Sequence, residues 1–226
     1  FKKGLDSLEN NCKIIISSPD YPYRCPPAPY ERASMIANYL KGKNVKFKIL
    51  IFDSKNSFTK KSIFLKEWKE MYGNSIEWVS KQNGGQISRF EKKKVFNSDG
   101  DKIKGDFIHI IPEQKAGKII FDSKLCKNDW CTINPQTFQL LNFKDIYAVG
   151  DSVDAGDMPK SAFSAESQAK ILSLNLINRI LQKSYLNPVF LNTCYSFSSN
   201  DRAFSITSWY KLNTMKDRIV SLGSSQ

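Results

Sequence analysis

The sequence predicts an α/β protein whose N-terminal half folds around a parallel β-sheet. Two apolar runs, residues 14–17 and 47–53, have the length of buried strands. Between them, apolar residues recur with the spacing of one helix face: Ala33, Ile36, Ala37 and Leu40. A strand, a helix and a second strand of this length form a right-handed βαβ unit, in which the two strands are parallel.

The limits of this helix and the elements after it are also predicted. Pro29 fits the first turn of the helix, where a missing N–H group costs nothing, and Gly42 ends the helix. Residues 58–72 predict a second amphipathic helix and residues 76–79 a short strand. Residues 107–111 predict a further buried strand.

A hairpin, a short strand and a long helix are predicted next. The Asp-Gly pair at 99–100, between alternating segments, is typical of a hairpin turn. Residues 146–149 predict a short strand that ends in the Gly-Asp pair at 150–151. A long helix then begins near Ser161, with an apolar stripe formed by Ala165, Ala169, Leu172, Leu176 and Ile180.

After residue 183 the pattern predicts a small strand-rich C-terminal domain. The stretch "LNPVFLNTCYSFSSNDRAFSITSWYKL" alternates as antiparallel strands do and is rich in Phe, Tyr, Ser and Thr. We therefore place a domain boundary near residue 184. The chain opens with Phe1 and a stretch typical of a helix end, so we expect it to be a processed product or a fragment.

The composition is that of a globular protein with a basic surface. Hydrophobic residues make up 41% of the chain, and the formal charge is +12. No apolar run reaches the roughly 20 residues of a membrane span, so we expect no stable membrane insertion. The lysines are scattered without interleaved aromatic residues, which favours a solvated basic face over a nucleic-acid site. Such a face could also dock an acidic protein.

Cysteine and histidine spacing argues against a metal site and against a hydrolase. The only histidine, His109, lies in a predicted buried strand, where it is a poor catalytic base. Cys12 lies beside a strand and is interpreted as structural. Cys126 and Cys131 could pair with each other, or each could be a packed thiol. No pair has CxxC spacing among the five cysteines, which are Cys12, Cys25, Cys126, Cys131 and Cys194.

The loop after the first strand is unusual for a dinucleotide-binding unit. Such a unit carries GxGxxG at this place, because the backbone must approach a pyrophosphate closely. This chain has "SPDYPYRCPPAP" there instead. Proline removes N–H donors and adds bulk, so the loop predicts a rigid support for Cys25 rather than a nucleotide cradle.

The stretch "IYAVGDSVDAGDMPKSAFSAESQAK" resembles the second flavin contact of flavoproteins with two dinucleotide-binding domains. In that family the aspartate, here Asp151, bonds the ribityl or phosphate region of FAD, and the helix that begins near Ser161 points at the pyrimidine end. A helix N-terminus carries roughly half a positive charge and stabilises an anionic reduced flavin. The alternative interpretation is an ordinary loop before a helix.

Several stretches together resemble the flavin-binding subunit of flavocytochrome c sulfide dehydrogenase. They are "RCPPAPYERA", "SFTKKSIFLKEWKEMYG", "IPEQKAGKI", "WCTINPQTF", "GDMPKSAFSAESQAK" and "YLNPVFLNTCYS". The resemblance runs over nearly the whole chain, and its most specific element is the Cys-Pro-Pro loop combined with the later Asn-Thr-Cys. Departures are mild, since the family often has glycine where this chain has Ala28 and Ala162.

The resemblance implies an FAD/NAD(P)-binding, Rossmann-like fold of the glutathione-reductase type. Residues 1–112 would be a degenerate second dinucleotide-binding-like domain, residues 113–183 the return segment of the FAD-binding domain, and residues 184–226 the strand-rich interface domain. The family's FAD pyrophosphate site and its flavin-attachment cysteine would lie in an N-terminal segment outside this chain. Export of the precursor to the periplasm is also implied.

The resemblance further implies an activity and a set of site residues. The family oxidises sulfide with FAD and passes the electrons to a c-type cytochrome subunit; because this chain has no CxxCH, the haem belongs to that partner. Cys25 and Cys194 match a redox-active disulfide beside the flavin, and Glu31 matches a candidate acid/base. The expected flavin contacts are Gly150, Asp151, Pro159, Lys160 and Ser161.

Two other functions are compatible with parts of the sequence. A sulfide:quinone reductase would share the chemistry, but such enzymes bind membranes through amphipathic C-terminal helices, whereas residues 185–226 are polar and strand-like. A degenerate flavoprotein-like domain that only recruits a redox or sulfur partner, polysulfide included, is disfavoured by the intact Cys25, Glu31 and Cys194.

Overall fold

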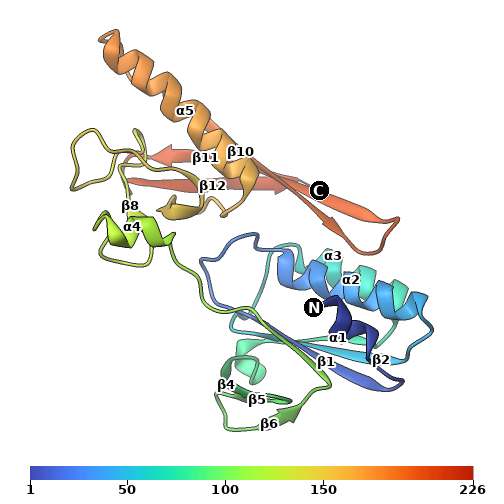
Figure 1. The fold of residues 1–226 in the computed structure, drawn as a ribbon. Helices are drawn as coiled ribbons and strands as arrows, with labels where there is room; N and C mark the ends of the chain where they lie inside the picture. Colours follow the sequence, from blue (N-terminus) through green and yellow to red (C-terminus); the bar gives the residue numbers. More distant parts are fainter. Residues whose placement is uncertain (226) are drawn as a thin grey trace. The chain divides into compact units, whose positions relative to one another are not determined.

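The computed structural model describes residues 1–225 and shows an α/β chain built from two compact units (Figure 1). The first unit comprises Phe1–Tyr21, Pro26–Glu113 and Ser196–Phe204. The second comprises Pro22–Cys25, Gln114–Tyr195 and Ser205–Gln226. The three-part division at residues 112 and 183 stays a prediction. No helix among residues 1–225 is both long enough and apolar enough to span a membrane.

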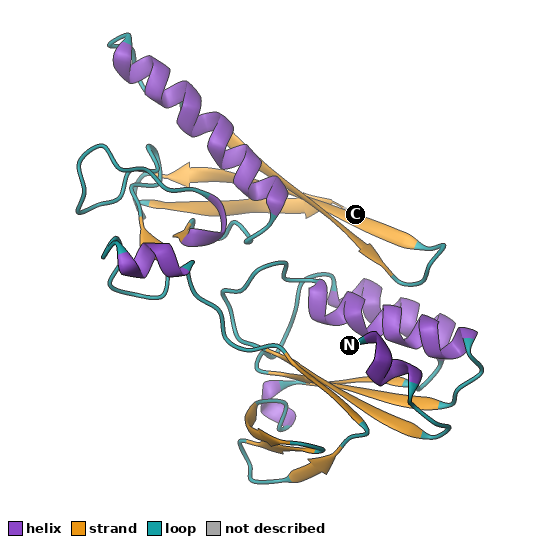
Figure 2. Ribbon diagram, in the orientation of Figure 1, coloured by secondary structure: helices purple, strands orange, loops and turns teal. Residues whose placement is uncertain are grey.

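The first unit is built on a four-stranded parallel sheet with strand order β3-β2-β1-β7. Helices cover one face of this sheet, and a small antiparallel sheet covers the other (Figures 1 and 2). The strands are β1 (Cys12–Ser18), β2 (Phe47–Asp53), β3 (Ile76–Val79) and β7 (Phe107–Ile110). The covering elements are α1 (Lys2–Asp6), α2 (Ala28–Gly42), α3 (Lys61–Tyr72), η1 (Lys81–Asn83), β4 (Ile87–Glu91), β5 (Lys94–Asn97) and β6 (Lys102–Lys104).

Alternation along β1 explains these layers. Ile14 and Ile16 are fully buried in the core beneath the helices, whereas Ile15 is buried on the opposite face against Val95 of β5. Successive strand residues point to opposite faces, so a strand covered on both sides is apolar throughout. This is why the sequence of β1 has an unbroken isoleucine run rather than an alternating pattern.

The predicted βαβ unit is confirmed, with two corrections nearby. β1 and β2 pair in parallel, and α2 has Pro29 in its first turn. The second helix begins at Lys61 rather than at residue 58, because Phe58 is buried and stacks on Tyr30 with ring centroids 3.6 Å apart. The strand predicted as buried at 107–111 is β7, which is half-buried along its length, since it lies at the edge of the sheet.

The second unit contains two small helical turns, one long helix and most of a three-stranded sheet of order β10-β11-β12. Its core includes Phe138, whose ring meets that of Phe190 edge-on at 5.9 Å. The predicted strand-rich C-terminal region is therefore confirmed. The elements are α4 (Lys118–Asp122), β8 (Cys131–Thr132), η2 (Gly150–Ser152), β9 (Val153–Asp154), α5 (Ala162–Ile180), β10 (Val189–Phe197), β11 (Ala203–Asn213) and β12 (Arg218–Ser225).

Two expectations for the second unit are wrong. The predicted strand at 146–149 is an extended loop with a single bridge between Tyr147 and Gln139. The predicted apolar stripe of α5 is not its buried face, because Ile180 is 79% exposed and the stripe's other members are half-buried. The buried residues of α5 are instead polar: Ser164, Gln168 and Asn175. The reason is that these side chains have polar partners: Asn175 Nδ2 donates to Gln136 O at 2.9 Å, and Gln168 Oε1 accepts from Gly150 N at 2.7 Å, both in loop backbone, while Ser164 Oγ donates to the Asn192 side chain at 3.2 Å.

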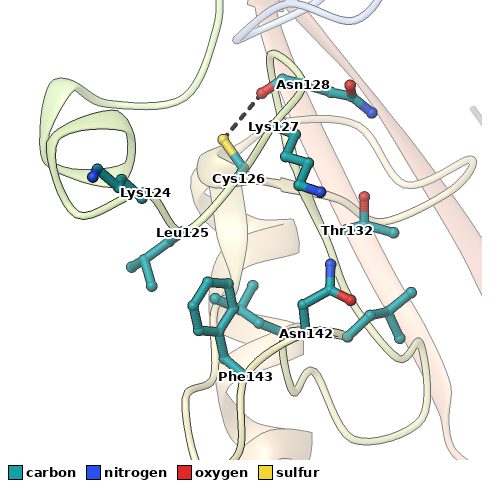
Figure 3. Close-up of a pocket in the computed structure, with 10 residues that line it drawn as sticks. Lys124, Leu125, Cys126, Lys127, Asn128, Thr132, Asn142 and Phe143 are labelled. Carbon is teal, nitrogen blue, oxygen red and sulfur yellow. Dashed lines mark hydrogen bonds between the residues drawn. The ribbon is translucent and has the colours of Figure 1, made fainter.

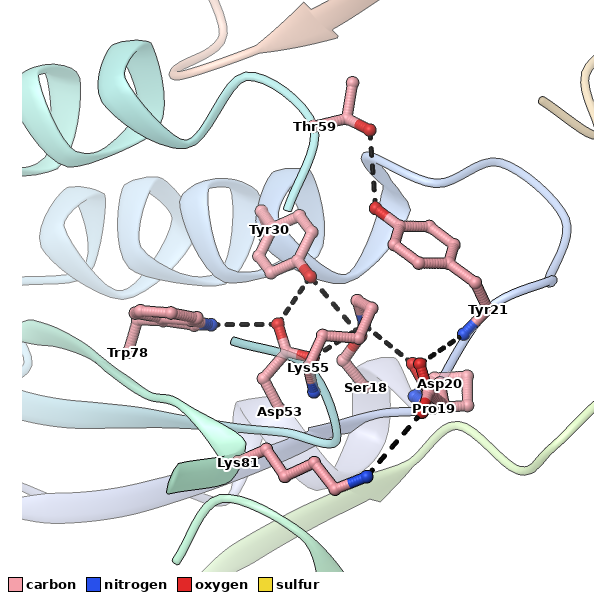
Figure 4. Close-up of polar contacts among 10 residues, drawn as sticks. All are labelled: Ser18, Pro19, Asp20, Tyr21, Tyr30, Asp53, Lys55, Thr59, Trp78 and Lys81. Carbon is pink, nitrogen blue, oxygen red and sulfur yellow. Dashed lines mark hydrogen bonds and ion pairs between the residues drawn. The ribbon is translucent and has the colours of Figure 1, made fainter. Parts of the chain in front are cut away.

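The carboxyl ends of β1 and β2 hold a buried ion pair (Figure 4). Asp53 ends β2 with no exposed surface, and Lys55 Nζ donates to its Oδ1 at 2.6 Å. Tyr30 and Trp78 donate to Oδ2 of the same carboxylate at 2.6 and 2.8 Å. Lys55 also donates to Pro19 O at 2.6 Å, which ties the loop after β1 to the loop after β2. Burial lowers the pKa of Lys55, so its charge depends on Asp53.

Replacing Asp53 is expected to destabilise the chain strongly. Asp53→Asn leaves the Lys55 ammonium buried without its counter-charge, and breaking one partner of such a pair costs about 3–5 kcal/mol. Urea unfolding would measure this loss. The matched control is Asp145→Asn, because Asp145 pairs with Arg179 at 2.7 Å on the exposed surface. The control should cost about 0–1 kcal/mol; equal costs for the two variants would contradict the assigned role of the buried pair.

Candidate functional site

The predicted site residues fall into both units. Cys25, Cys194 and the predicted flavin contacts at 150–151 and 159–161 all lie in the second unit. Glu31 lies in the first unit, in the first turn of α2, with a half-buried side chain. The two cysteines and the predicted flavin contacts thus belong to one unit, and Glu31 belongs to the other.

The Gly-Asp turn approaches the start of α5 closely. Gly150 is buried, has a φ of +72° and donates its N–H to Gln168 Oε1 at 2.7 Å. A Cβ added at Gly150 would lie 2.9 Å from the Cβ of Ala165, which is closer than side-chain carbons normally approach. Both the left-handed backbone and the lack of space require glycine at this position. The small residue at 165 therefore lets the turn and the helix touch.

Arg24 fastens the cysteine loop to this turn. Its Nε lies 3.4 Å from Asp151 Oδ2, and both side chains are about 40% exposed. The guanidinium also donates to Gln114 Oε1 at 3.2 Å and to Lys115 O at 2.9 Å. The Arg24 backbone N–H donates to the same Gln114 oxygen at 3.0 Å. A planar group with several donors can bind two chain segments at once, so Arg24, the residue before Cys25, is fixed to the turn at Asp151 and to residues 114–115.

Lys160 is a buried cation that faces the interior of its unit. Its Nζ donates to Val153 O at 2.5 Å and lies 3.7 Å from the centroid of the Trp130 ring. Lys160 is only 7% exposed. This burial lowers the pKa of Lys160 to about 8, although the negative charges of Asp151 and Asp154 oppose the shift. A desolvated cation over an indole face is stabilised by about 2 kcal/mol, which offsets part of the cost of burial.

The N-terminus of α5 is tied to Cys194 through Asn192. Ser161 is the N-cap of α5, and its Oγ accepts from Ser164 N at 3.1 Å. The same hydroxyl donates to Asn192 Oδ1 at 2.5 Å, and Ser164 Oγ donates to that oxygen at 3.2 Å. Asn192 Nδ2 in turn donates to Cys194 Sγ at 3.3 Å. Asn192 and Cys194 share one face of β10 because they are two residues apart.

Cys25 is held by Lys160, the residue before the N-cap of α5. Its backbone N–H donates to Lys160 O at 2.8 Å, and Arg24 makes a parallel bridge with Lys160. The Cys25 side chain is exposed, and its φ is +54°, a left-handed value that is strained for a residue with a Cβ. Two consecutive residues therefore connect to the two predicted redox cysteines. Lys160 binds the backbone of Cys25, and Ser161 binds Asn192, which in turn binds the sulfur of Cys194.

These residues fit a flavin. α5 has 19 residues, and the first N–H groups of any helix have no acceptor within it. The close turn at Gly150 brings backbone to the same end, and the exposed oxygens of Asp151 can accept from a hydroxyl. The first unit offers no comparable cradle, because the carboxylate that ends β2, where a dinucleotide-binding domain would bind the ribose, is consumed by Lys55, Tyr30 and Trp78.

Four residues with defined roles were missed from the sequence. Arg24, Trp130 and Gln168 act through contacts between segments far apart in the chain, and no local pattern points to them. Asn192 had a usable signal, because a residue two before Cys194 on a strand shares its face. The structure thus adds to the predicted site residues four residues that contact them or their neighbours.

Two family models match this chain. Residues 1–112 match a family model described as the sulfide dehydrogenase [flavocytochrome c] flavoprotein chain, central. Residues 186–226 match a second family model, flavocytochrome c sulphide dehydrogenase, flavin-binding. The second match contains Asn192 and Cys194, and the first contains Cys25 and Glu31. Both models describe the flavoprotein of flavocytochrome c sulfide dehydrogenase, the first its central part and the second its flavin-binding part.

Solved structures show the fold. A chain of the mitochondrial ATP synthase of Tetrahymena thermophila aligns with a TM-score of 0.61 and 16% identity over 90% of this chain. A ferredoxin reductase of Rhodopseudomonas palustris aligns with a TM-score of 0.55 and 13% identity over 93% of this chain. This chain spans about half of each of them, 51% and 55% respectively. The predicted FAD/NAD(P)-binding fold class is confirmed.

The low pKa of Lys160 predicts a specific pH dependence of stability. The pKa is about 8 in the folded chain and 10.5 ordinarily, so between these values the unfolded chain binds more protons and stability rises with pH. The gain should be on the order of 3 kcal/mol, because each pKa unit is worth about 1.4 kcal/mol. Lys160→Met should lack this rise. Urea unfolding at several pH values between 7.5 and 10.5 would measure the difference between the two curves, which cancels other titrating groups.

The matched control is Lys170→Met, on the helix α5 that follows Lys160. Lys170 is exposed and pairs with Glu166 at 2.8 Å, so its removal should leave the pH curve parallel to that of the parent. If the Lys160→Met curve were also parallel to the parent curve, the buried-cation assignment would be wrong.

Proposed function

Because the chain belongs to the flavoprotein-chain family of flavocytochrome c sulfide dehydrogenase, whose cofactor is FAD, we propose that it forms part of a sulfide-oxidising subunit. The proposed substrate is hydrosulfide or polysulfide, and the proposed electron acceptor is a c-type cytochrome subunit. The family matches support a flavin-dependent oxidoreductase; the sulfide chemistry and the acceptor are the proposal.

One observation carries the proposal. Cys25 and Cys194 are separated by most of the chain, yet both are connected to the two residues that begin α5. Lys160 O accepts from the Cys25 backbone, and Ser161 reaches Cys194 through Asn192. A helix start that favours negative charge is also where a reduced flavin is stabilised. The proposed pair of sulfurs and the proposed flavin contact therefore share one structural support.

The proposed reaction uses the two cysteines as a disulfide. Hydrosulfide attacks one sulfur, which forms a persulfide on that cysteine and releases the other cysteine as a thiolate. A second hydrosulfide then takes the outer sulfur of the persulfide as hydrodisulfide, which leaves both cysteines reduced, so two electrons have passed from the substrate to the pair. A bound FAD supplies the acceptor for these two electrons when the disulfide is formed again. A base is needed to accept the proton that hydrosulfide loses.

Glu31 is the proposed acid/base. It lies in the first turn of α2, directly after the Cys-Pro-Pro loop, and is half-buried. The two prolines before the helix restrict the path between Cys25 and Glu31, since each fixes φ near −65°. A carboxylate this close in sequence to the reactive sulfur could take the substrate proton.

The basic charge of the chain gives a reason for a cytochrome partner with an acidic face. The formal charge is +12, and opposite charges on two proteins accelerate their encounter. We also propose a periplasmic location, because the family resemblance implies an exported precursor.

Removing either cysteine is expected to abolish reduction of the flavin by sulfide. The flavin-loaded protein would be titrated anaerobically with sulfide while loss of the oxidised-flavin absorbance is recorded. Cys25→Ser and Cys194→Ser should retain the absorbance, because an oxygen cannot form the disulfide that hydrosulfide attacks. Cys12→Ser is the control, since Cys12 is buried in β1 and donates to Lys46 O at 3.7 Å, which a serine can also do. Bleaching of Cys25→Ser at the parent rate would reject the disulfide role.

Glu31→Gln tests the proton transfer separately. Loss of general acid–base catalysis typically slows a reaction about 10²- to 10⁴-fold. The rate of flavin reduction should therefore fall within this range, while dithionite still reduces the flavin fully. An unchanged sulfide rate would show that Glu31 does not transfer the proton.

Electron transfer to the cytochrome should depend on salt. The bimolecular rate constant between reduced flavoprotein and its cytochrome is expected to fall as ionic strength rises, because exposed charges are screened beyond about 10 Å at 0.1 M salt. Stopped-flow measurement of haem reduction across a series of salt concentrations checks this. A flat response would argue against electrostatic docking.

A further inference from the structure

A second pair of cysteines lies in the second unit and has no part in the proposed sulfide chemistry. Cys126 follows α4, and Cys131 begins β8. The short stretch between them ends with Trp130, the residue whose ring lies under Lys160. Both cysteines are thiols in this structure.

The two thiols lie together. Cys131 has no exposed surface and belongs to the core of the second unit, and Cys126 packs against that core. Burial, and after it the neighbouring Cys126 thiol, raise the pKa of the Cys131 thiol, which places the two sulfurs near each other in this core. The Cys126 thiol donates to Asn128 O at 3.0 Å, so the chain turns directly after Cys126 (Figure 3).

The two thiols differ in access. Cys126 is half-buried and lines a cavity of about 280 Å³ with neighbours that include Thr132 and Phe143 (Figure 3). Cys131 is fully buried, and this burial raises the pKa of its thiol to about 11. A protonated, buried thiol is a poor first nucleophile, whereas a half-exposed one can meet a reagent.

We propose that Cys126 and Cys131 form a second dithiol–disulfide pair, separate from Cys25 and Cys194, that closes the loop carrying Trp130. The oxidant is a small disulfide. The Cys126 sulfur attacks it, forms a mixed disulfide and releases one thiol. The Cys131 sulfur then attacks the Cys126 sulfur and releases the second thiol. The two protons and two electrons of the cysteines end on the two released thiols.

The loop that this disulfide closes supports the Cys25 backbone. The Trp130 ring carries the Lys160 ammonium at 3.7 Å and the Arg24 guanidinium at 5.7 Å. Lys160 O accepts the N–H of Cys25 at 2.8 Å, and Arg24 immediately precedes Cys25. Fixing Trp130 therefore restrains both residues that hold Cys25. The Cys126–Cys131 pair is a positioning element in the second unit.

The test counts thiols in a chain without the other pair. Cys25→Ser/Cys194→Ser leaves Cys12, Cys126 and Cys131, so fully reduced protein should bind three maleimide labels after denaturation. Incubation with oxidised glutathione should remove two of the three, and non-reducing peptide mapping should find residues 126 and 131 in one cross-linked peptide. Retention of three reactive thiols, or a stable glutathione adduct on Cys126 alone, would overturn the proposal.

Two further measurements complete the test. In parent protein with all five cysteines, peptide mapping should find the same Cys126–Cys131 link, which excludes an effect of the serine substitutions on folding. In Cys25→Ser/Cys194→Ser, hydrogen exchange at the backbone amide of residue 25 should slow when the protein is oxidised. When Cys126→Ser is added to this variant, oxidation should leave that exchange rate unchanged. An exchange rate that ignores oxidation would overturn the positioning role. Because the reactive pair is absent, these outcomes are independent of sulfide oxidation.

Discussion

The start of α5 is the constraint on which the second unit depends. Ser161 caps the helix with its own hydroxyl and shares that hydroxyl with Asn192, while the preceding carbonyl of Lys160 receives the Cys25 backbone. This cap holds the helix end in one geometry, because the Ser161 hydroxyl accepts the N–H of Ser164. Every residue proposed for flavin contact in this unit lies at or beside this helix end. The two cysteines acquire their positions from it, and neither is placed by its own neighbours alone.

A buried lysine binds loop backbone in each unit, Lys55 in the first and Lys160 in the second, and these two lysines are stabilised differently. Lys55 has a carboxylate at 2.6 Å, so its charge is neutralised by a full counter-ion. Lys160 has a carbonyl at 2.5 Å and an indole face at 3.7 Å, so it is held by partial charges. Full pairing makes the first cluster a fixed part of the fold. Partial compensation leaves Lys160 with a pKa of about 8, within reach of ordinary pH.

The buried carboxylate of the first unit and the exposed side chains near the start of α5 in the second unit explain why the flavin contacts are proposed for the second unit. In the first unit the carboxylate that ends β2 accepts from Tyr30 and Trp78, and the loop after β1 is rich in proline. In the second unit Gly150 permits close approach and Asp151 keeps an exposed carboxylate. The two places differ in the environment of the carboxylate, because Asp53 ends β2 fully buried and paired, whereas Asp151 follows an extended loop and keeps exposed surface.

The sequence by itself determined the βαβ unit, the hairpin and the helix that starts after Ser161, because periodicity and turn chemistry act between near neighbours. It also determined the family, through the Cys-Pro-Pro and Asn-Thr-Cys motifs. Only the tertiary structure decided that the buried face of α5 is polar and that the segment before Gly150 is a loop. It alone placed Trp130 under Lys160 and Asn192 between Ser161 and Cys194. These contacts join residues distant in the chain, and a local pattern carries no record of which distant backbone a polar side chain will bind.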